Sequence, residues 1–209
     1  MKAKPQAVNA PETLVLKLAL RHTDSERVIV LPRSLLVEDL HRIALKVFNF
    51  FGEHLSQVIR NNGRKSTVRP DFDRCEEFEG GDDIWSIPLR AFLPMLGSKA
   101  FIEYDFGDGW EIFVTRMADK ATAAPFTCIK SQGYDAIEDC GGPGGLADIY
   151  GDLADWLDAS KEERAEFESE RLDWAFELAS LTEEKARALL APPSSEEITR
   201  RIGNLKLET

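Results

Sequence analysis

Three carboxylates, Asp105, Asp108 and Glu111, stand close together in the sequence and belong to one predicted β-hairpin. We expect Phe106 to pair with Trp110 across a three-residue Gly-Asp-Gly loop, because a two-residue turn would mix polar and apolar side chains on both faces. That register sets Asp105 directly opposite Glu111. Like charges in a cross-strand pair are destabilising, so the sequence predicts an offsetting partner: a bound cation, an Arg or Lys, or a shared proton.

These hairpin carboxylates could ligate a metal ion. Carboxylate oxygens at this density suit a hard divalent cation such as Mg²⁺, Mn²⁺ or Ca²⁺, which makes Asp105, Asp108 and Glu111 candidate ligands. The alternative is structural. Asp108 lies between two glycines, as a tight turn favours, and Asp105 and Glu111 could each pair with an Arg or Lys.

A second acidic segment, Glu138-Asp139, precedes the glycine-rich stretch 141–145. A glycine-rich turn that opens a helix, here at Leu146, can hold an anion on its free N–H groups. Two acids upstream and the lack of a Gly-Lys-Ser/Thr sequence argue against a phosphate cradle. Two hypotheses remain: a loop that brings Glu138 and Asp139 beside the hairpin acids, or a simple connector between sheet and helix.

Two of the histidines could add nitrogen ligands to such a site. His41 flanks the apolar face of a predicted helix and His54 opens a predicted strand. A lone histidine in either place is more often a hydrogen-bonded structural residue than a ligand. Together with the acids, however, His41 and His54 could complete a mixed nitrogen–oxygen site that Mn, Fe or Zn accepts. No catalytic-triad or zinc-protease motif is present.

The elements that must position these residues follow from hydrophobic periodicity. Alternation predicts strands over 13–20, 27–31 and 54–60 and a hairpin of 99–106 with 110–116, whereas helical spacing predicts a helix over 36–51 that is capped by Gly52. A loop is expected at 70–83, a short helix at 88–96, and helices at 146–157, 161–181, 183–190 and 195–202, with N-caps at Ser160, Thr182 and Ser194. The fold class is therefore α+β, with a mixed or mainly antiparallel sheet backed by a helix.

The same patterns predict the domain organisation and the core. Residues 1–157 form an α+β domain, and residues 158–209 form a helical extension packed on that domain. The core combines the helix stripe with one face of the hairpin. Its expected members are Leu40, Ile43, Val47, Phe48, Ile102, Tyr104, Phe106, Trp110, Ile112 and Val114.

Composition limits the partners. The chain has 209 residues, 37 acidic and 26 basic, and a formal net charge of −11. This balance argues against nucleic-acid binding, which depends on Lys and Arg contacts with phosphates, although Arg60, Arg64, Lys65 and Arg69 form a local basic cluster. No apolar run is long enough to span a membrane, and three widely spaced cysteines favour reduced thiols in the cytoplasm.

Taken together, several segments resemble one protein family. They are Asp39-Leu40-His41, His54-Leu55, the hairpin run 104–111, Cys128 and Glu138-Asp139-Cys140-Gly141-Gly142. They look like the plasmid pRiA ORF-three-like family, a group of bacterial and plasmid-borne proteins that includes passenger proteins of insertion elements. The resemblance covers roughly residues 13–157. It implies an α+β domain and brings no established activity.

Two positions depart from the family pattern. The family usually has a histidine after the Trp-Glu of the hairpin, where this chain has Ile112, and a second histidine after His54-Leu55, where this chain has Ser56. A family site that relies on either imidazole would therefore be altered here.

We expect a binding or accessory module, with a mobile-element connection suggested by the resemblance, that acts on an unidentified protein or small ligand through the acidic hairpin and the glycine-rich loop. The alternative is a metal-dependent hydrolase in which the same carboxylates serve as ligands or as general acid and base, with His41 or His54 assisting. A DNA-holding recombinase accessory is a third option, against which the acidic charge counts. An enzyme would require these side chains to converge around one pocket, whereas a binding module could leave them spread over a surface.

Overall fold

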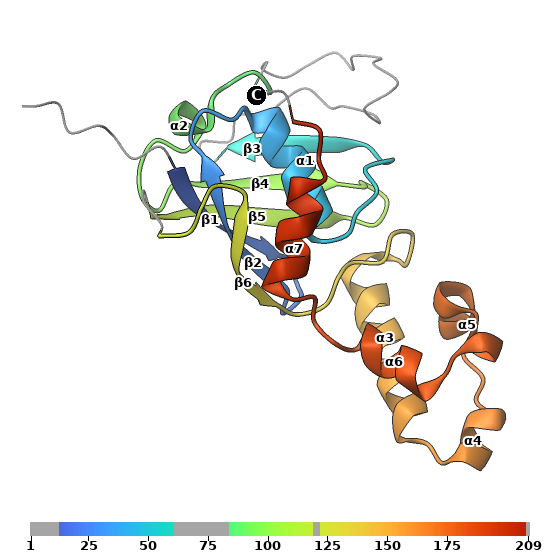
Figure 1. The fold of residues 1–209 in the computed structure, drawn as a ribbon. Helices are drawn as coiled ribbons and strands as arrows, with labels where there is room; N and C mark the ends of the chain where they lie inside the picture. The colour runs from blue at the N-terminus through green and yellow to red at the C-terminus, as the bar shows by residue number, and fades with distance from the viewer. Residues whose placement is uncertain (1–12, 61–83, 119–121, 208–209) are drawn as a thin grey trace, which may run out of the picture.

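Six strands of the described residues form one antiparallel sheet (Figure 1). The computed structural model describes residues 13–60, 84–118 and 122–207. The strands are β1 (Thr13–Leu20), β2 (Glu26–Pro32), β3 (Ser56–Arg60), β4 (Lys99–Tyr104), β5 (Trp110–Ala118) and β6 (Thr127–Gln132). They lie in the order β3-β4-β5-β1-β2-β6, and every neighbouring pair is antiparallel. The predicted α+β class and mainly antiparallel sheet are confirmed.

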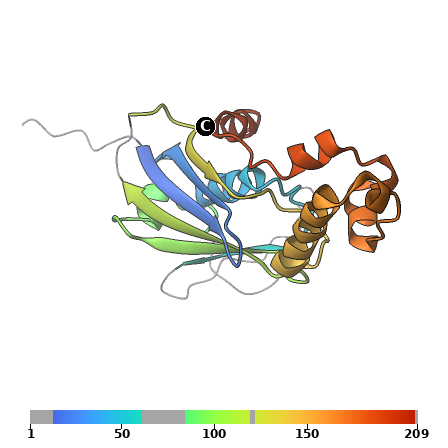
Figure 2. The same cartoon turned by 90° about the horizontal axis from the view of Figure 1, so that it is seen from below.

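Two helices back the sheet. α1 (Val37–Val47) and α7 (Ser195–Gly203) contact each other and share one apolar core with the strands (Figure 2). α7 also packs along β6, where the Thr199 hydroxyl accepts a 2.9 Å hydrogen bond from the Cys128 N–H. β6 is an edge strand of the sheet, and α7 packs against it. The sequence pattern did not predict this strand, because Cys128 is the one residue of β6 that is buried. The short α2 (Leu89–Phe92) begins after Pro88, as predicted.

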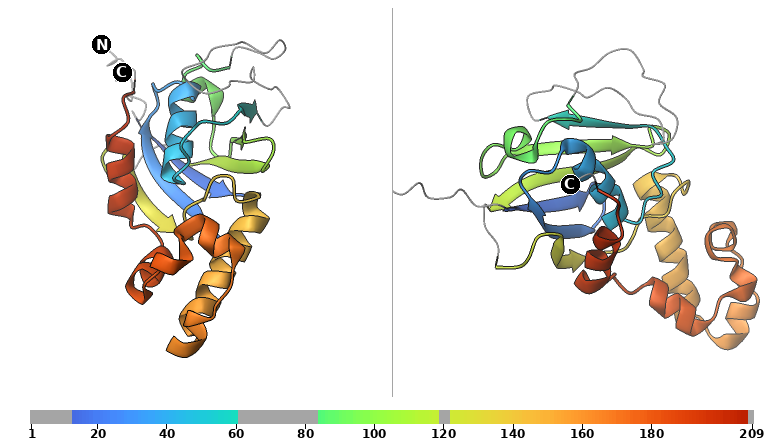
Figure 3. Two further views of the ribbon diagram at one scale, coloured as in Figure 1. Left: turned by 90° about the vertical axis from the view of Figure 1, so that its right-hand side faces the viewer. Right: turned by 45° about the horizontal axis from the view of Figure 1, so that its top comes forward.

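The remaining helices form a group that projects beyond one end of the sheet (Figure 3). They are α3 (Gly142–Asp158), α4 (Lys161–Ala165), α5 (Glu170–Phe176), η1 (Leu178–Ser180) and α6 (Glu183–Leu189). Their own apolar cluster joins α3 to α5 and α6 and includes Leu153, Trp156 and Leu172. The division of the chain at residue 157 stays a prediction.

The helix boundaries confirm some expectations and correct others. Ser160, Thr182 and Ser194 are N-caps, each accepting a hydrogen bond from a backbone N–H of its helix. The single helix predicted over 161–181 is wrong. It is interrupted because the Ser169 side chain caps a new helix by accepting from the Leu172 N–H, and because Glu177 adopts a left-handed backbone with φ of 53°.

Helix α1 also ends earlier than predicted. Its last residue is Val47. Asn49, and not the predicted cap Gly52, is the first residue after the helix with a left-handed backbone (φ 70°). Asparagine tolerates this conformation because its short polar side chain can bond locally. The segment from Phe50 onward therefore lies outside the helix, and it places His54 near the hairpin residue Asp105.

The predicted hairpin register is wrong by two residues. Tyr104, not Phe106, pairs with Trp110, so five residues form the loop and Glu103 lies opposite Glu111. The loop is closed by the Gly109 N–H, which donates to the Asp105 carbonyl at 2.7 Å. Because side chains alternate with a period of two, a two-residue shift changes every partner but keeps every side chain on its face.

The core is accordingly close to the predicted one. Leu40, Ile43, Val47, Phe48, Ile102, Tyr104, Trp110, Ile112 and Val114 are all buried. Phe106 is the exception, with 47% of its surface exposed, because the longer loop places it beyond the end of β4. The predicted loop at 70–83 lies outside the described residues. None of the described helices combines the length and apolar character that crossing a membrane would require.

Candidate functional site

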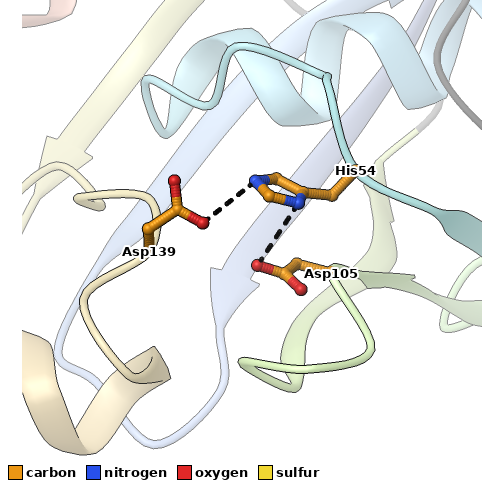
Figure 4. A group of neighbouring side chains, drawn as sticks. All are labelled: His54, Asp105 and Asp139. Atoms are coloured by element: carbon orange, nitrogen blue, oxygen red, sulfur yellow. Dashed lines mark ion pairs between the residues drawn. The ribbon is translucent and has the colours of Figure 1, made fainter.

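His54 lies between two aspartates that come from different loops (Figure 4). Its Nδ1 is 3.8 Å from Asp105 Oδ2, and its Nε2 is 3.4 Å from Asp139 Oδ1. One ligand atom from each of these three residues can be chosen so that all lie within 4.8 Å of one another. Among the described residues, this is the group of His, Cys, Asp and Glu side chains that could hold a metal ion.

Asp105 is oriented by the hairpin loop. It follows β4 directly with a left-handed backbone (φ 51°), and its N–H donates to the Leu55 carbonyl at 2.9 Å. Its Oδ1 accepts from the N–H groups of Gly107 (3.1 Å) and Asp108 (3.4 Å). Aspartate suits this conformation because its carboxylate can bond the backbone two residues on. One oxygen thus holds the turn, and the other, Oδ2, faces His54.

Asp139 is held in place by the glycine-rich loop that leads into α3. It also has a left-handed backbone, with φ of 58°, and its side chain is 66% exposed. The Gly141 N–H donates to Asp108 Oδ2 at 3.1 Å. A Cβ at Gly142, which has φ of 71°, would lie 2.1 Å from the Asp108 carbonyl oxygen. The glycines are therefore required for the loop to press against the hairpin tip.

A hydrogen-bonded group centred on Tyr104 and Glu138 ties these segments together. The Tyr104 hydroxyl donates to Glu138 Oε1 and accepts from the Gly52 N–H at 3.1 Å. The same carboxylate oxygen accepts from the Phe51 N–H at 2.8 Å. Burial, together with the neighbouring Glu138, raises the pKa of the Tyr104 phenol, which therefore stays protonated and able to donate.

Each part of this group lies next to a member of the histidine–aspartate cluster. Tyr104 precedes Asp105, Glu138 precedes Asp139, and the bonded N–H groups of Phe51 and Gly52 lie just before His54. The ring of Tyr104 also packs edge-on against His54, with 5.7 Å between centroids. The group therefore fixes three sequence-distant segments relative to one another.

The other predicted site residues lie elsewhere or make structural contacts. Glu111 pairs with Arg21, and Asp108 bonds Gly141. His41 is buried in α1, where its ring packs edge-on against Trp85 at 5.2 Å. The structure thus brings together His54, Asp105 and Asp139, holds Glu138 behind Asp139, and leaves Glu111 and His41 outside the cluster.

Cys140 lies beside the cluster but is a poor thiolate ligand. Burial, and then the charge of Asp108, raise the pKa of its thiol to about 11. Its Sγ lies 3.4 Å from the Gly142 carbonyl oxygen, to which the thiol donates. At neutral pH the thiol is protonated, whereas metal binding and nucleophilic attack both need the thiolate.

One imidazole and two carboxylates define what the cluster can do. Carboxylates alone favour Mg²⁺ or Ca²⁺, whereas an imidazole in the set favours first-row transition metals such as Mn²⁺, Fe²⁺ or Zn²⁺. Three protein ligands leave coordination positions for a further ligand. The exposure of Asp139 puts those positions within reach of solvent.

Sequence reasoning placed Tyr104 only in the core and did not identify it as the centre of this hydrogen-bonded group. The available signal was its position directly before Asp105, at the end of a buried strand. A buried tyrosine hydroxyl usually finds a hydrogen-bond partner, so a partner for Tyr104 could have been expected. Which residue serves could not be read from the pattern, since Glu138 is distant in sequence.

Comparison with known proteins supports the resemblance seen in the sequence. Residues 12–183 match the family described as plasmid pRiA4b ORF-3-like protein. The chain is 28% identical over 145 residues to the uncharacterized protein y4hQ of Sinorhizobium fredii (strain NBRC 101917 / NGR234), covering 67% of this chain and 72% of the relative.

A solved structure shares the fold. It is the crystal structure of the protein of unknown function MM3350 from Methanosarcina mazei Go1, with a TM-score of 0.57 and 22% sequence identity. The similarity covers 78% of this chain and 88% of that protein. At this identity it is evidence for the fold alone.

Proposed function

Since the chain belongs to the plasmid pRiA4b ORF-3-like protein family, we propose that it is a binding module that works through a divalent cation held by His54, Asp105 and Asp139. The observation that carries the proposal is the placement of His54 between the two carboxylates, at 3.8 Å and 3.4 Å. The cation would join the hairpin loop to the glycine-rich loop and present its remaining coordination positions to a ligand. The family's plasmid association suggests an accessory role in mobile elements.

The donor set favours a transition metal. Zn²⁺ and Mn²⁺ both accept imidazole nitrogen together with carboxylate oxygen, whereas Mg²⁺ and Ca²⁺ prefer oxygen alone. The cation would also offset the carboxylate charges, which His54 does only when it is protonated. Zn²⁺ or Mn²⁺ is therefore expected to bind more tightly than Mg²⁺.

The contacts of Glu138 and Glu111, two of the predicted acids outside the cluster, favour a binding role over hydrolysis. A metal-dependent hydrolase usually needs a general base near the bound metal, within reach of the attacking water. Glu138 is the predicted acid closest in sequence to Asp139, but its Oε1 already accepts from Tyr104 and Phe51. Glu111 is paired with Arg21. Within the described residues, these two predicted acids are therefore engaged in other contacts, which counts against either of them as the base.

The proposal is tested by thermal unfolding with and without Mn²⁺ or Zn²⁺. A ligand that binds only the folded state stabilises it by about 2.7 kcal/mol at a hundredfold excess over its Kd, so the Tm should rise. Asp105→Asn should abolish the rise while preserving the loop, because asparagine tolerates the left-handed backbone and its oxygen can accept the same turn bonds. Glu111→Gln is the matched control in the same hairpin and should respond as the unmodified chain does.

Absence of any Tm response to either metal would contradict the proposal, and so would an equal response in the two variants. The hydrolase alternative is tested separately. If metal-loaded protein cleaved an activated phosphate or carboxylate ester, and Asp105→Asn lost that cleavage, the binding role would have to give way to catalysis.

A further inference from the structure

A small cavity lies between α1 and the C-terminal segment that follows α7. Its volume is about 270 Å³, which is near the lower limit of ligand pockets, typically about 300 to 1,000 Å³. Leu45 and Phe50, both buried, supply apolar wall. Leu205 closes the other side and packs against the core. Phe51 stands beside them with 71% of its surface exposed.

The rim of this apolar cavity is basic. Arg42 and Lys46 are four residues apart on α1 and so share one helix face, and Lys206 approaches from the C-terminal segment. Three cationic side chains around one small cavity contrast with the net charge of −11 of the whole chain. By contrast, two other lysines, Lys17 and Lys130, both pair with Glu26.

Within the part of the chain that the structure describes, two of these three cations have no acidic partner. Arg42 pairs with Glu38, with 3.4 Å between Nη2 and Oε1. Within the described residues, neither Lys46 nor Lys206 has a carboxylate within ion-pair distance. Lys46 has a structural explanation, since a cation in the last turn of a helix interacts favourably with the helix dipole. That explanation does not extend to Lys206, which comes from a different part of the chain and meets Lys46 at the same cavity.

We propose that this cavity binds a small organic anion with an apolar body. The apolar part would lie against Leu45, Phe50 and Leu205, and an aromatic ring could stack on the exposed face of Phe51. The carboxylate or phosphate would be held by Lys46 and Lys206, whose flexible stems can bring the ammonium groups to either anion. The site is separate from the cation cluster, although Phe51 belongs to the same segment as His54.

A set of small probes distinguishes the contribution of the anionic group to binding from that of the apolar body. Binding to the full chain is followed by NMR chemical-shift titration of the amides of Leu45, Phe51 and Leu205. Benzoate and phenyl phosphate carry both features, benzamide lacks the charge, and acetate and inorganic phosphate lack the ring. Benzoate should bind about fivefold more tightly than benzamide, as expected for two exposed lysine contacts. The stronger of benzoate and phenyl phosphate identifies the preferred anion.

Variants then assign the contacts. The double variant Lys46→Gln with Lys206→Gln should bind benzoate no better than benzamide, whereas Lys99→Gln, at an exposed lysine that opens β4, should bind it as the unmodified chain does. Asp105→Asn should also bind benzoate normally, because the cavity does not depend on the cation cluster. Equal affinity for benzoate and benzamide, an equal loss in the double variant and in Lys99→Gln, or no shift at millimolar concentrations of any probe would overturn the proposal.

Discussion

Tyr104 donates its hydroxyl hydrogen to Glu138, and each of these residues directly precedes one of the two aspartates that flank His54. The contact is partly buried, and it joins the end of β4 to the loop that leads into α3. The geometry of the candidate metal site therefore depends on a bond that none of the metal ligands makes.

We predict that Tyr104→Phe weakens Mn²⁺ or Zn²⁺ binding by about 10- to 100-fold, the usual effect of losing a residue that orients metal ligands. The variant keeps the aromatic ring in the core, and the loss of one hydrogen bond should cost about 1 kcal/mol of unfolding free energy. Titration calorimetry and denaturant unfolding measure the two effects.

Tyr150→Phe is the control for this experiment. Its hydroxyl donates to the Asp135 carbonyl at 3.3 Å, away from the cluster, so it should lose similar stability and keep its metal affinity. If the two tyrosine variants bound metal equally well, Tyr104 would be a core residue without a positioning role.

A second prediction concerns two glycines in the first turn of α3, Gly142 and Gly144. Gly142→Ala should lower the unfolding free energy by at least about 2 kcal/mol, because alanine is strained at a φ of 71° and its Cβ would meet the Asp108 carbonyl oxygen at 2.1 Å. Gly144→Ala should be neutral or stabilising by up to about 1 kcal/mol, since its Cβ would meet nothing within 4 Å in a helix. Urea unfolding of both variants measures the two changes in unfolding free energy. Similar changes in the two variants would contradict the close approach of Gly142 to the hairpin loop at Asp108.

The thiol of Cys140 provides a pH-dependent prediction. Its pKa is raised from 9.0 to about 11 in the folded state, so the protonated thiol favours folding. The resulting stability is fully present below pH 9 and is lost as the pH rises from 9 to about 11. Alkylation by iodoacetamide, read by peptide mass spectrometry, should be slow at pH 8 in the folded protein and should accelerate toward pH 11. Alkylation at pH 8 as fast as in the unfolded chain would refute the raised pKa.

We also predict no strong binding to duplex DNA at physiological salt, because the net charge of −11 opposes contact with phosphates. Of the basic cluster found in the sequence, only Arg60 lies in the described residues. There its guanidinium packs over Phe92 and donates to the Ala91 carbonyl at 3.0 Å. Gel retardation at sub-micromolar protein provides the measurement. Salt-sensitive retardation would refute this prediction and would make the basic cluster, including Arg64, Lys65 and Arg69 outside the described residues, the first candidate for DNA contact.

The sequence by itself determined which face of β4 and of β5 is buried. Alternation in β4 and β5 placed Ile102, Tyr104 and Ile112 in the core, and they are buried although the predicted register was wrong. A period of two cannot distinguish registers that differ by two residues, so the partner of each strand residue was not determined. Loop length decided it, and with it the exposure of Phe106.

Only the tertiary structure decided which candidate residues form a site. His54, Asp105 and Asp139 come from three segments that long-range pairing brings together: the stretch after α1, the β4–β5 loop and the loop before α3. The sequence marked all seven candidate residues in the same way, as acids and histidines of suitable chemistry. Contacts with distant residues separated them, because Arg21 holds Glu111 and Trp85 packs on His41, while Tyr104 holds Glu138 so that Asp139 faces His54.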